Sequence, residues 1–445
     1  MTTGSPTKHL LQFATPLLIG NLFQQFYNMV DSLVVGNYVG ANALAAVGNC
    51  GSMNFLFFSL SMGLAMGIGI IVAQFFGAGN EEKIRATIAN AIYVLLAVSI
   101  AVSVIGILIS PSLLRLLETP DDIIGDSIIY LRVTCAGMIG IAVYNGVAAI
   151  LRALGDSKTP LYFLIVACIV NIVLDLLFVL GFNWGVFGVA FATIIAQAIS
   201  GITCVVYAYR KVEYFHLKRE QMKPDAEIIK RSFMLGVPMA LQNSLIAISC
   251  MVLQGVVNSF GKSVMAAYTI IGRIEQIVQQ PYSSLGMAIT TYTGQNIGAG
   301  EIERVEQGYR KSVIMALIFS VLLIPVAYLF GNSIISAFVK EPEVIEIGVK
   351  ALRINSLFYF PLGMIYVPRA LLNGAGDSGF AMINGITEVA GRIGYSQILT
   401  RISAIGFWGV WLTTGATWAT TAVVCVIRYK HGGWKAKSVV QRSDN

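Results

Sequence analysis

The segment AQFFGAG at residues 73–79 recurs as GQNIGAG at residues 294–300, which lie 221 positions further along the chain. The tripeptide Gly-Asp-Ser at residues 155–157 returns at residues 376–378 with the same offset. Other matches continue in this register, within one residue, along the whole sequence, which is the signature of an internal repeat. The sequence therefore predicts two copies of one structural unit.

The composition indicates that both copies lie in a lipid bilayer. The chain has 445 residues, of which 56% are hydrophobic and only 12% are charged, and its mean hydropathy is +0.73. Soluble proteins are about 25% charged, so the composition excludes an ordinary soluble enzyme, a disordered chain and a coiled coil. The net charge of +7 gathers in short segments between apolar runs, a pattern typical of membrane loops rather than of nucleic-acid binding.

Twelve apolar segments, six in each copy, are long enough to cross a bilayer, which takes roughly 20 helical residues. We predict an all-α polytopic membrane protein with twelve transmembrane helices in two pseudo-symmetric six-helix lobes. The predicted spans are residues 11–36, 44–76, 86–110, 127–151, 160–181, 186–209, 232–258, 264–296, 311–331, 346–372, 379–400 and 406–428.

The longest polar stretch separates the two sets of spans. We predict an N-lobe at residues 1–210, a cytoplasmic linker at 211–231, a C-lobe at 232–430 and a basic cytoplasmic tail at 431–445. An even number of spans per copy gives both copies the same topology. In transporters this symmetry places the substrate route between the halves, and no loop resembling a channel selectivity filter occurs in the sequence.

The distribution of Lys and Arg predicts which side the termini face. Most basic residues fall in connections that share a side with the N-terminus, and the opposite connections hold only Arg115, Lys262, Lys340 and Arg401. Because basic residues favour the cytoplasmic side, we predict a multi-pass protein of the cell membrane with both termini in the cytoplasm.

A polar stripe follows one face of the first predicted span. Gln24, Tyr27, Asn28 and Asp31 are spaced at i, i+3, i+4 and i+7, so a helix would place them side by side. A charge at membrane depth costs at least a few kcal/mol, so the mid-span Asp31 requires a reason. One alternative is that Asp31 only hydrogen-bonds a neighbouring helix.

Further polar residues of the first copy complete a candidate cation site. Asn171 and Asp175 share a face of the fifth span, Thr193 supplies a hydroxyl from the sixth, and Asn145 supplies an amide from the fourth. Carboxylate, amide and hydroxyl oxygens are hard ligands that suit a proton or a small cation such as Na⁺. We therefore predict that Asp31, Asp175, Asn171 and Thr193 bind the coupling ion.

The second copy carries a different set of charges. Its intramembrane charges are Arg273 and Glu275 in the eighth span and Glu388 and Arg392 in the eleventh. Glu388 and Arg392 are spaced at i, i+4 with the acid first, which favours an ion pair, and the repeat predicts that Glu275 approaches Arg392. Structural pairing is the favoured interpretation, and a role in binding substrate or protons stays open.

Pro16 interrupts the first span fifteen residues before Asp31. Proline frees a backbone carbonyl and kinks a helix, so Pro16 is a candidate hinge that responds to the charge of Asp31. A fixed kink is the equally weighted alternative.

Taken together, several stretches resemble the multidrug and toxic compound extrusion (MATE) family, most closely its DinF-like branch. They are PLLIGNLFQQFYNMVDSLVVGNYVGANALAAVG at 16–48, the paired segments at 73–79 and 294–300, ILRALGDSKTP at 150–160, NIVLDLLF at 171–178 and RIEQ at 273–276. The resemblance covers essentially the whole chain. It implies cation-coupled export of amphipathic, often cationic, organic compounds, with Asp31 as the coupling residue and an N-lobe cation site.

The sequence as a whole predicts a monomeric antiporter that exports organic cations in exchange for inward H⁺ or Na⁺. Cofactors and resident metals are not expected, apart from Na⁺ at the cation site. The alternative is a flippase for a lipid-linked precursor; a membrane enzyme has little support, because no metal or nucleophile constellation occurs in the sequence. Candidate residues of the substrate cavity are Gln24, Tyr27, Asn28, Asn145, Gln276 and Gln280.

Overall fold

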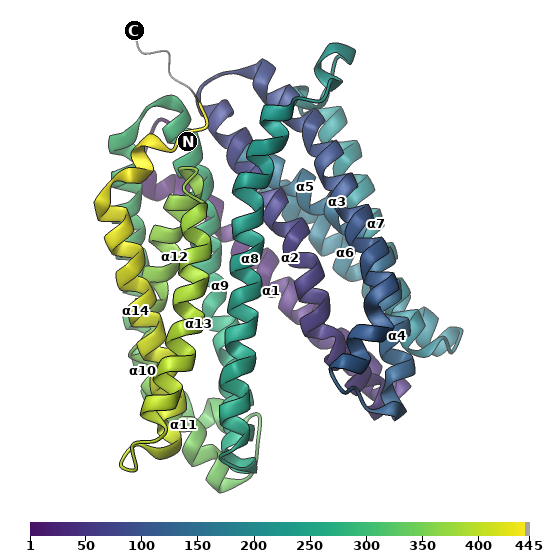
Figure 1. Cartoon of the computed structure of the whole chain (residues 1–445), viewed down its shortest axis with the longest axis vertical. Coiled ribbons are helices and arrows are strands. Elements are labelled where there is room, and N and C mark those ends of the chain that lie inside the picture. The colour runs from purple at the N-terminus through teal and green to yellow at the C-terminus, as the bar shows by residue number, and fades with distance from the viewer. Residues whose placement is uncertain (441–445) are drawn as a thin grey trace. The chain divides into compact units, whose positions relative to one another are not determined.

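The computed structural model describes residues 1–440, and within them the chain forms helices and no strand (Figure 1). The last five residues of the predicted basic tail lie outside the described part. The α-helices are α1 (Pro6–Val34), α2 (Ala41–Gly77), α3 (Glu81–Leu116), α4 (Asp121–Ala136), α5 (Met138–Ala153), α6 (Lys158–Leu176), α7 (Gly185–Lys211), α8 (Ala226–Asn258), α9 (Lys262–Ala299), α10 (Ile302–Ser336), α11 (Pro342–Ser356), α12 (Tyr359–Gly374), α13 (Gly379–Leu399) and α14 (Gly409–His431).

Six short helical segments complete the description. Two are π-helical turns and four are 3₁₀ turns. They are η1 (Val35–Val39), η2 (Leu177–Gly181), η3 (Glu213–Phe215), η4 (Arg219–Met222), η5 (Gly406–Trp408) and η6 (Gly433–Ala436).

Each of the twelve predicted spans coincides with one helix or one pair of helices. The fourth span is the pair α4 and α5, bent by 46°, and the tenth is the pair α11 and α12. Gly137 lies at the first bend because a Cβ there would overlap Ile194 of α7. The twelve-helix, two-lobe prediction is confirmed.

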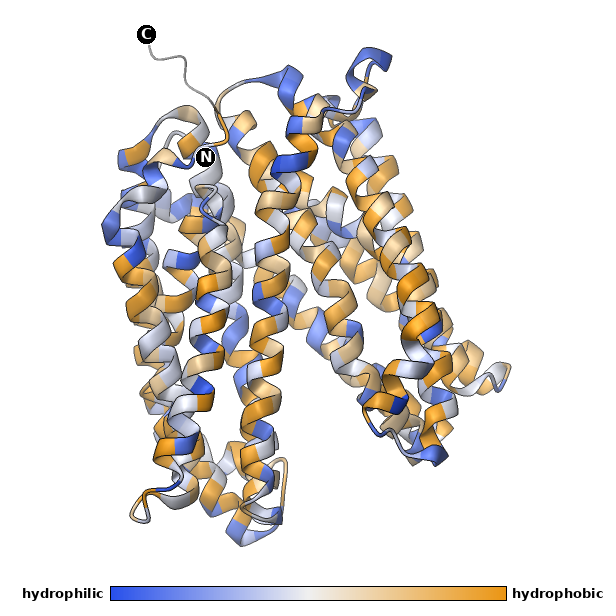
Figure 2. Ribbon diagram, viewed as in Figure 1, coloured by the Kyte–Doolittle hydropathy of each residue, from blue (hydrophilic) through white to orange (hydrophobic). Residues whose placement is uncertain are grey.

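Seven described helices are long and apolar enough to cross a membrane by themselves, or eight when the bent pair α4 and α5 counts as one span. The helices α1, α9 and α13 are not among them. Each of these three carries charged residues within the predicted span: Asp31 on α1, Arg273 and Glu275 on α9, and Glu388 and Arg392 on α13. Figure 2 shows hydrophobic residues along most of the helix lengths, with hydrophilic residues gathered at the connections and scattered within some helices.

The chain divides into two compact units. The N-lobe unit holds Thr15–Ala240 together with Val439 and Val440, and the C-lobe unit holds Met1–Ala14 and Leu241–Ser438. The polar stretch at 211–231 belongs to the N-lobe unit, where Arg85 of α3 donates hydrogen bonds to the carbonyl oxygens of Glu213 (2.8 Å) and His216 (2.9 Å).

The repeat is visible in the backbone of the two halves. Ten glycines in the described residues have a positive φ angle, and eight of them form four pairs separated by 221 positions. Only glycine adopts this conformation without strain, so each pair preserves the same kind of turn in both copies. The pairs are Gly40 and Gly261, Gly79 and Gly300, Gly155 and Gly376, and Gly185 and Gly406.

Small residues allow α2 and the first half of α8 to pack closely within the N-lobe unit. A Cβ on Gly63 would lie 2.6 Å from the Gly236 carbonyl oxygen, and one on Gly67 would lie 2.8 Å from the Gly236 nitrogen. Such close backbone approach is the common use of small residues in membrane helices. The contact fixes the position of α2 beside the start of α8.

Candidate functional site

The carboxyl groups of Asp31 and Asp175 meet inside the N-lobe unit. Asp31 lies on α1 and Asp175 on α6, and their side chains lie close to each other. Asp175 is fully buried. Two ionised carboxylates this close would repel each other, so the pair favours a bound proton or a small cation.

Each of the two acids also has an unused oxygen. The Oδ1 atoms of Asp31 and Asp175 are buried and have no hydrogen-bond partner among residues 1–440. Buried polar atoms normally find a partner. Two such oxygens at one carboxyl pair are a donor set that fits a proton or a small hard cation.

Asn171 and Thr193 lie beside this carboxyl pair. In the orientation that satisfies both ends of its amide, Asn171 donates to Asp175 Oδ2 at 2.8 Å and accepts from the backbone N–H of Thr193 at 3.1 Å. The Thr193 hydroxyl lies 3.3 Å from the hydroxyl of Tyr27. The helices α1, α6 and α7 thus bring all four predicted coupling residues into one group, with Tyr27 at its edge.

Tyr130 is a further member of this group that the sequence did not reveal. It lies on α4, interacts electrostatically with Asp31 and Asp175, and packs against a cluster of buried valines. Nothing in the local sequence of α4 distinguishes Tyr130 from other aromatic residues of the spans. Its position depends on how α4 packs, which helical periodicity does not give.

Both helices that carry the acids end in a π-helical turn. After Asp31, α1 continues into η1 and ends at Gly40, which has φ 124° and donates to the Val35 carbonyl at 3.0 Å. After Asp175, α6 continues into η2. Wide π turns often occur at functional sites. Valines from both turns, Val35 and Val179, pack in the same buried cluster.

A small cavity of about 10 Å³ lies next to the site. That volume is close to the space that one water molecule needs. Its lining residues come from α1, α6 and α7: Gln24, Tyr27, Leu164, Ala167, Cys168, Asn171, Thr193, Ala196 and Gln197.

The other predicted cavity residues lie elsewhere. Asn28 is exposed and accepts a hydrogen bond from Gln24 at 3.4 Å, while Asn145 donates to the Ile141 carbonyl of its own helix at 3.0 Å. Gln280 donates to the Gln276 carbonyl on α9 at 2.8 Å, within the C-lobe unit. Of the six predicted residues, the small cavity therefore brings together only Gln24 and Tyr27.

Three of the predicted intramembrane charges of the C-lobe unit lie in one cluster, but they interact at long range and form no direct ion pair with one another. Glu275 accepts a hydrogen bond from Asn355 of α11, and Arg273 is exposed. Arg392 interacts electrostatically with Glu388 and Glu275. However, none of Arg392, Glu388 and Glu275 forms an ion pair within 4.0 Å in the described residues.

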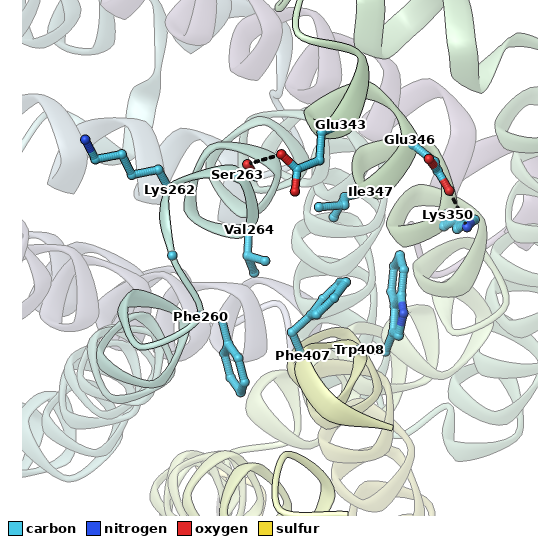
Figure 3. A pocket seen from close by; sticks show the side chains of 11 residues that line it. Phe260, Lys262, Ser263, Val264, Glu343, Glu346, Ile347, Lys350, Phe407 and Trp408 are labelled. Carbon is cyan, nitrogen blue, oxygen red and sulfur yellow. Dashed lines mark hydrogen bonds and ion pairs between the residues drawn. The ribbon is translucent and has the colours of Figure 1, made fainter. Parts of the chain in front are cut away.

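A larger pocket of about 470 Å³ lies at one end of the C-lobe unit, between the turn from α8 to α9, the start of α11 and η5 (Figure 3). Ser263 donates to Glu343 Oε2 at 2.8 Å, and Lys350 pairs with Glu346 at 2.7 Å beside the ring of Trp408. The sequence analysis did not single out this pocket. Its charged groups mostly satisfy one another.

The comparison with known families agrees with this arrangement. The MatE family model matches residues 16–177 and 238–391, more than half of the chain. The chain belongs to the MatE family. Two similar relatives are the probable multidrug resistance proteins YpnP and YoeA of Bacillus subtilis. YpnP is 31% identical over 98% of this chain and 97% of its own length, and YoeA is 29% identical over 96% and 94%.

Solved structures of MATE transporters share the fold. A MOP-superfamily transporter from Pyrococcus furiosus is 24% identical, with a TM-score of 0.89 and coverage of 97% of both chains. Because the chain belongs to the MatE family, it is a multi-pass membrane transporter and not an enzyme.

Proposed function

We propose that this MatE protein is a secondary active antiporter of the cell membrane that exports amphipathic organic compounds carrying a positive charge. Inward movement of H⁺ or Na⁺ drives the export, and both termini face the cytoplasm. The relatives YpnP and YoeA are named as probable multidrug resistance proteins, which supports the substrate class.

The observation that carries the proposal is the carboxyl pair of Asp31 and Asp175. Two ionised carboxylates this close repel each other strongly, because the interior of a membrane protein screens charge poorly. The pair is relieved by a proton or by a cation on the unpartnered oxygens. Loading and unloading of the ion therefore changes the force between α1 and α6.

The changed force on α1 also links ion binding to the small cavity. Asp31 and Tyr27 are one turn apart on α1, and Tyr27 lines the small cavity together with Thr193. Pro16 lies inside α1, where it removes a helix hydrogen bond. In the proposed cycle, binding of the ion at Asp31 bends α1 near Pro16 and closes an N-lobe pocket that holds substrate in another state of the transporter, so that ion and substrate compete. A monomer suffices for this cycle, because the two lobes form one chain.

The test is efflux of ethidium from proteoliposomes with a proton gradient or a sodium gradient imposed separately. The wild type should drive efflux under one of the two gradients, and Asp31→Asn should abolish it. Ser32→Ala is the matched control, because Ser32 is the exposed neighbour of Asp31 on α1 and donates only to the Asn28 carbonyl. Gradient-driven efflux that survives in Asp31→Asn would overturn the proposal.

A further inference from the structure

Two opposite charges are buried one helical turn apart on α13. Glu388 is 4% exposed and Arg392 is 7% exposed. Buried charges are normally paired directly, because removing a charge from water is expensive. Neither side chain is in an ion pair within 4.0 Å in the described part of the chain, and Nε of Arg392 has no hydrogen-bond partner there.

The neighbouring charges have other partners. Glu275 accepts from Asn355, and the guanidinium of Arg369 stacks over the ring of Tyr366 at 4.8 Å. Glu388 interacts with Arg369 and Arg392 only at longer range. The two acids and two arginines balance to zero net charge, but Glu388 and Arg392 retain unused hydrogen-bonding capacity.

Other unpartnered polar atoms lie on α13 and on two helices that pack against it. Nδ2 of Asn384, Nε2 of Gln242 and Oγ1 of Thr417 are buried without a hydrogen-bond partner among residues 1–440. Asn384 lies one turn before Glu388 on α13.

Two close helix contacts place Gln242 and Thr417 beside the same stretch of α13. A Cβ on Gly385 would lie 3.2 Å from Cα of Gln242 on α8, and one on Gly391 would lie 3.1 Å from Oγ1 of Thr417 on α14. Helices α8, α13 and α14 of the C-lobe unit thus pack against one another along the stretch that carries Glu388 and Arg392, and each has an unpartnered polar atom.

We propose that Glu388 and Arg392 form a binding site for a zwitterionic group, with the positive group of the ligand on Glu388 and a carboxylate on Arg392. Side chains at i, i+4 are about 5–6 Å apart at Cβ, so the two ligand charges lie about one helical turn apart. The cluster is neutral, so a bound cation or a bound anion would leave one unbalanced charge in an interior that screens charge poorly. A bound zwitterion leaves no unbalanced charge. This inference refines the substrate class of the proposed exporter and rests on that function.

The test compares two dyes that differ by one charge, tetramethylrhodamine, a zwitterion, and its methyl ester, a cation. Fluorescence polarisation measures their binding to the purified full-length protein in detergent without any gradient. A charge-assisted hydrogen bond contributes about 1.5–3 kcal/mol, so the wild type should bind the zwitterion at least about tenfold more tightly than the ester. Equal affinities in the wild type would overturn the proposal.

Variants of Arg392 test whether this residue causes the preference for the zwitterion. Arg392→Gln should remove the preference for the zwitterion, because it removes the partner of the carboxylate and leaves a negative cluster that the cationic ester neutralises. Arg392→Lys should keep part of the preference. Arg401→Gln is the matched control, because Arg401 is exposed just beyond α13 and pairs with Gln397. A preference that persists in Arg392→Gln would assign the cluster a purely structural role.

The binding preference between the two dyes does not depend on ion coupling. Asp31→Asn should retain the wild-type preference between the two dyes, because binding needs no gradient. Selective binding without gradient-driven transport would contradict the antiporter alone, and transport without selective binding would contradict the zwitterion site alone.

Discussion

Asn355 donates a hydrogen bond from its side-chain amide to the carboxyl of Glu275, which links α11 to α9. The residues 221 positions earlier form the same link, since Thr134 Oγ1 donates to Asn54 Oδ1 at 2.9 Å. The repeat therefore preserves a contact between helices while it changes a neutral pair into a charged one. The two lobes thus share this helix contact and differ in its charge.

Loss of the hydrogen-bond donor should destabilise the protein more at Asn355 than at Thr134. Asn355→Leu leaves a charged carboxyl unpaired and should lower the free energy of unfolding by about 3 kcal/mol. Thr134→Val leaves only a neutral amide and should cost about 1 kcal/mol. Unfolding of the detergent-solubilised variants by denaturant titration measures both values. The added change Glu275→Leu should recover most of the loss in Asn355→Leu, and equal losses in the two single variants would contradict this interpretation.

The sequence predicted those features that follow from repetition and hydropathy. The register of 221 and the twelve spans are periodic patterns, and the structure contains both. The meeting of Asp31 with Asp175 followed from chemistry, because an isolated acid in a bilayer needs a partner. Their role in coupling stays a prediction.

The remaining features depend on packing between helices. The bend between α4 and α5 follows from the contact of Gly137 with Ile194, and Tyr130 reaches the acids only because α4 lies beside them. The unpaired state of Glu388 and Arg392 could not be predicted either. Their i, i+4 spacing favours a pair, and only the three-dimensional arrangement shows that the pair is not direct.

The ligands around Asp175 should tune the affinity for the coupling ion. Thr193→Val removes a hydroxyl next to Asn171 and Tyr27. The concentration of the coupling ion that gives half-maximal ethidium efflux should rise about tenfold, which corresponds to about 1.4 kcal/mol for one hydrogen bond. Thr203→Val is the control on the same helix, because the Thr203 hydroxyl donates only to carbonyls of α7. An equal rise in both variants would show that the effect is not local.

The close contact of α2 with α8 should make Gly236 intolerant of a side chain. A Cβ at Gly236 would lie 2.6 Å from Cα of Leu64, so Gly236→Ala should lower the free energy of unfolding by about 1–3 kcal/mol. Gly255→Ala tests the same change on the same helix, where nothing lies within 4 Å of the added carbon. There the better helix propensity of alanine should stabilise the protein by roughly 0.5–1 kcal/mol. Thermal unfolding followed by intrinsic fluorescence distinguishes the two, and a loss of the same size at both positions would refute the steric argument.

Asp225 should make the beginning of α8 sensitive to acid. Its carboxyl accepts from the backbone N–H groups of Glu227 (2.9 Å) and Ile228 (3.3 Å) and pairs with Lys83 at 3.4 Å. Partial burial alone would raise the pKa of Asp225, but these hydrogen bonds and the ammonium of Lys83 outweigh burial and lower the pKa below its usual value. The stabilisation is therefore present above the usual pKa and is lost as the pH falls through the lowered one.

Hydrogen exchange of the first turns of α8 measures this loss. At pH 7, Asp225→Ala should reduce protection about fivefold, because loss of a helix cap costs about 1 kcal/mol. As the pH falls towards 3, the wild type should converge on the variant once the intrinsic pH dependence of exchange is removed. Glu220→Gln, at an exposed position of the same polar stretch, should keep the wild-type profile. A constant ratio between wild type and Asp225→Ala across this range would show that the charge of Asp225 does not hold the start of α8.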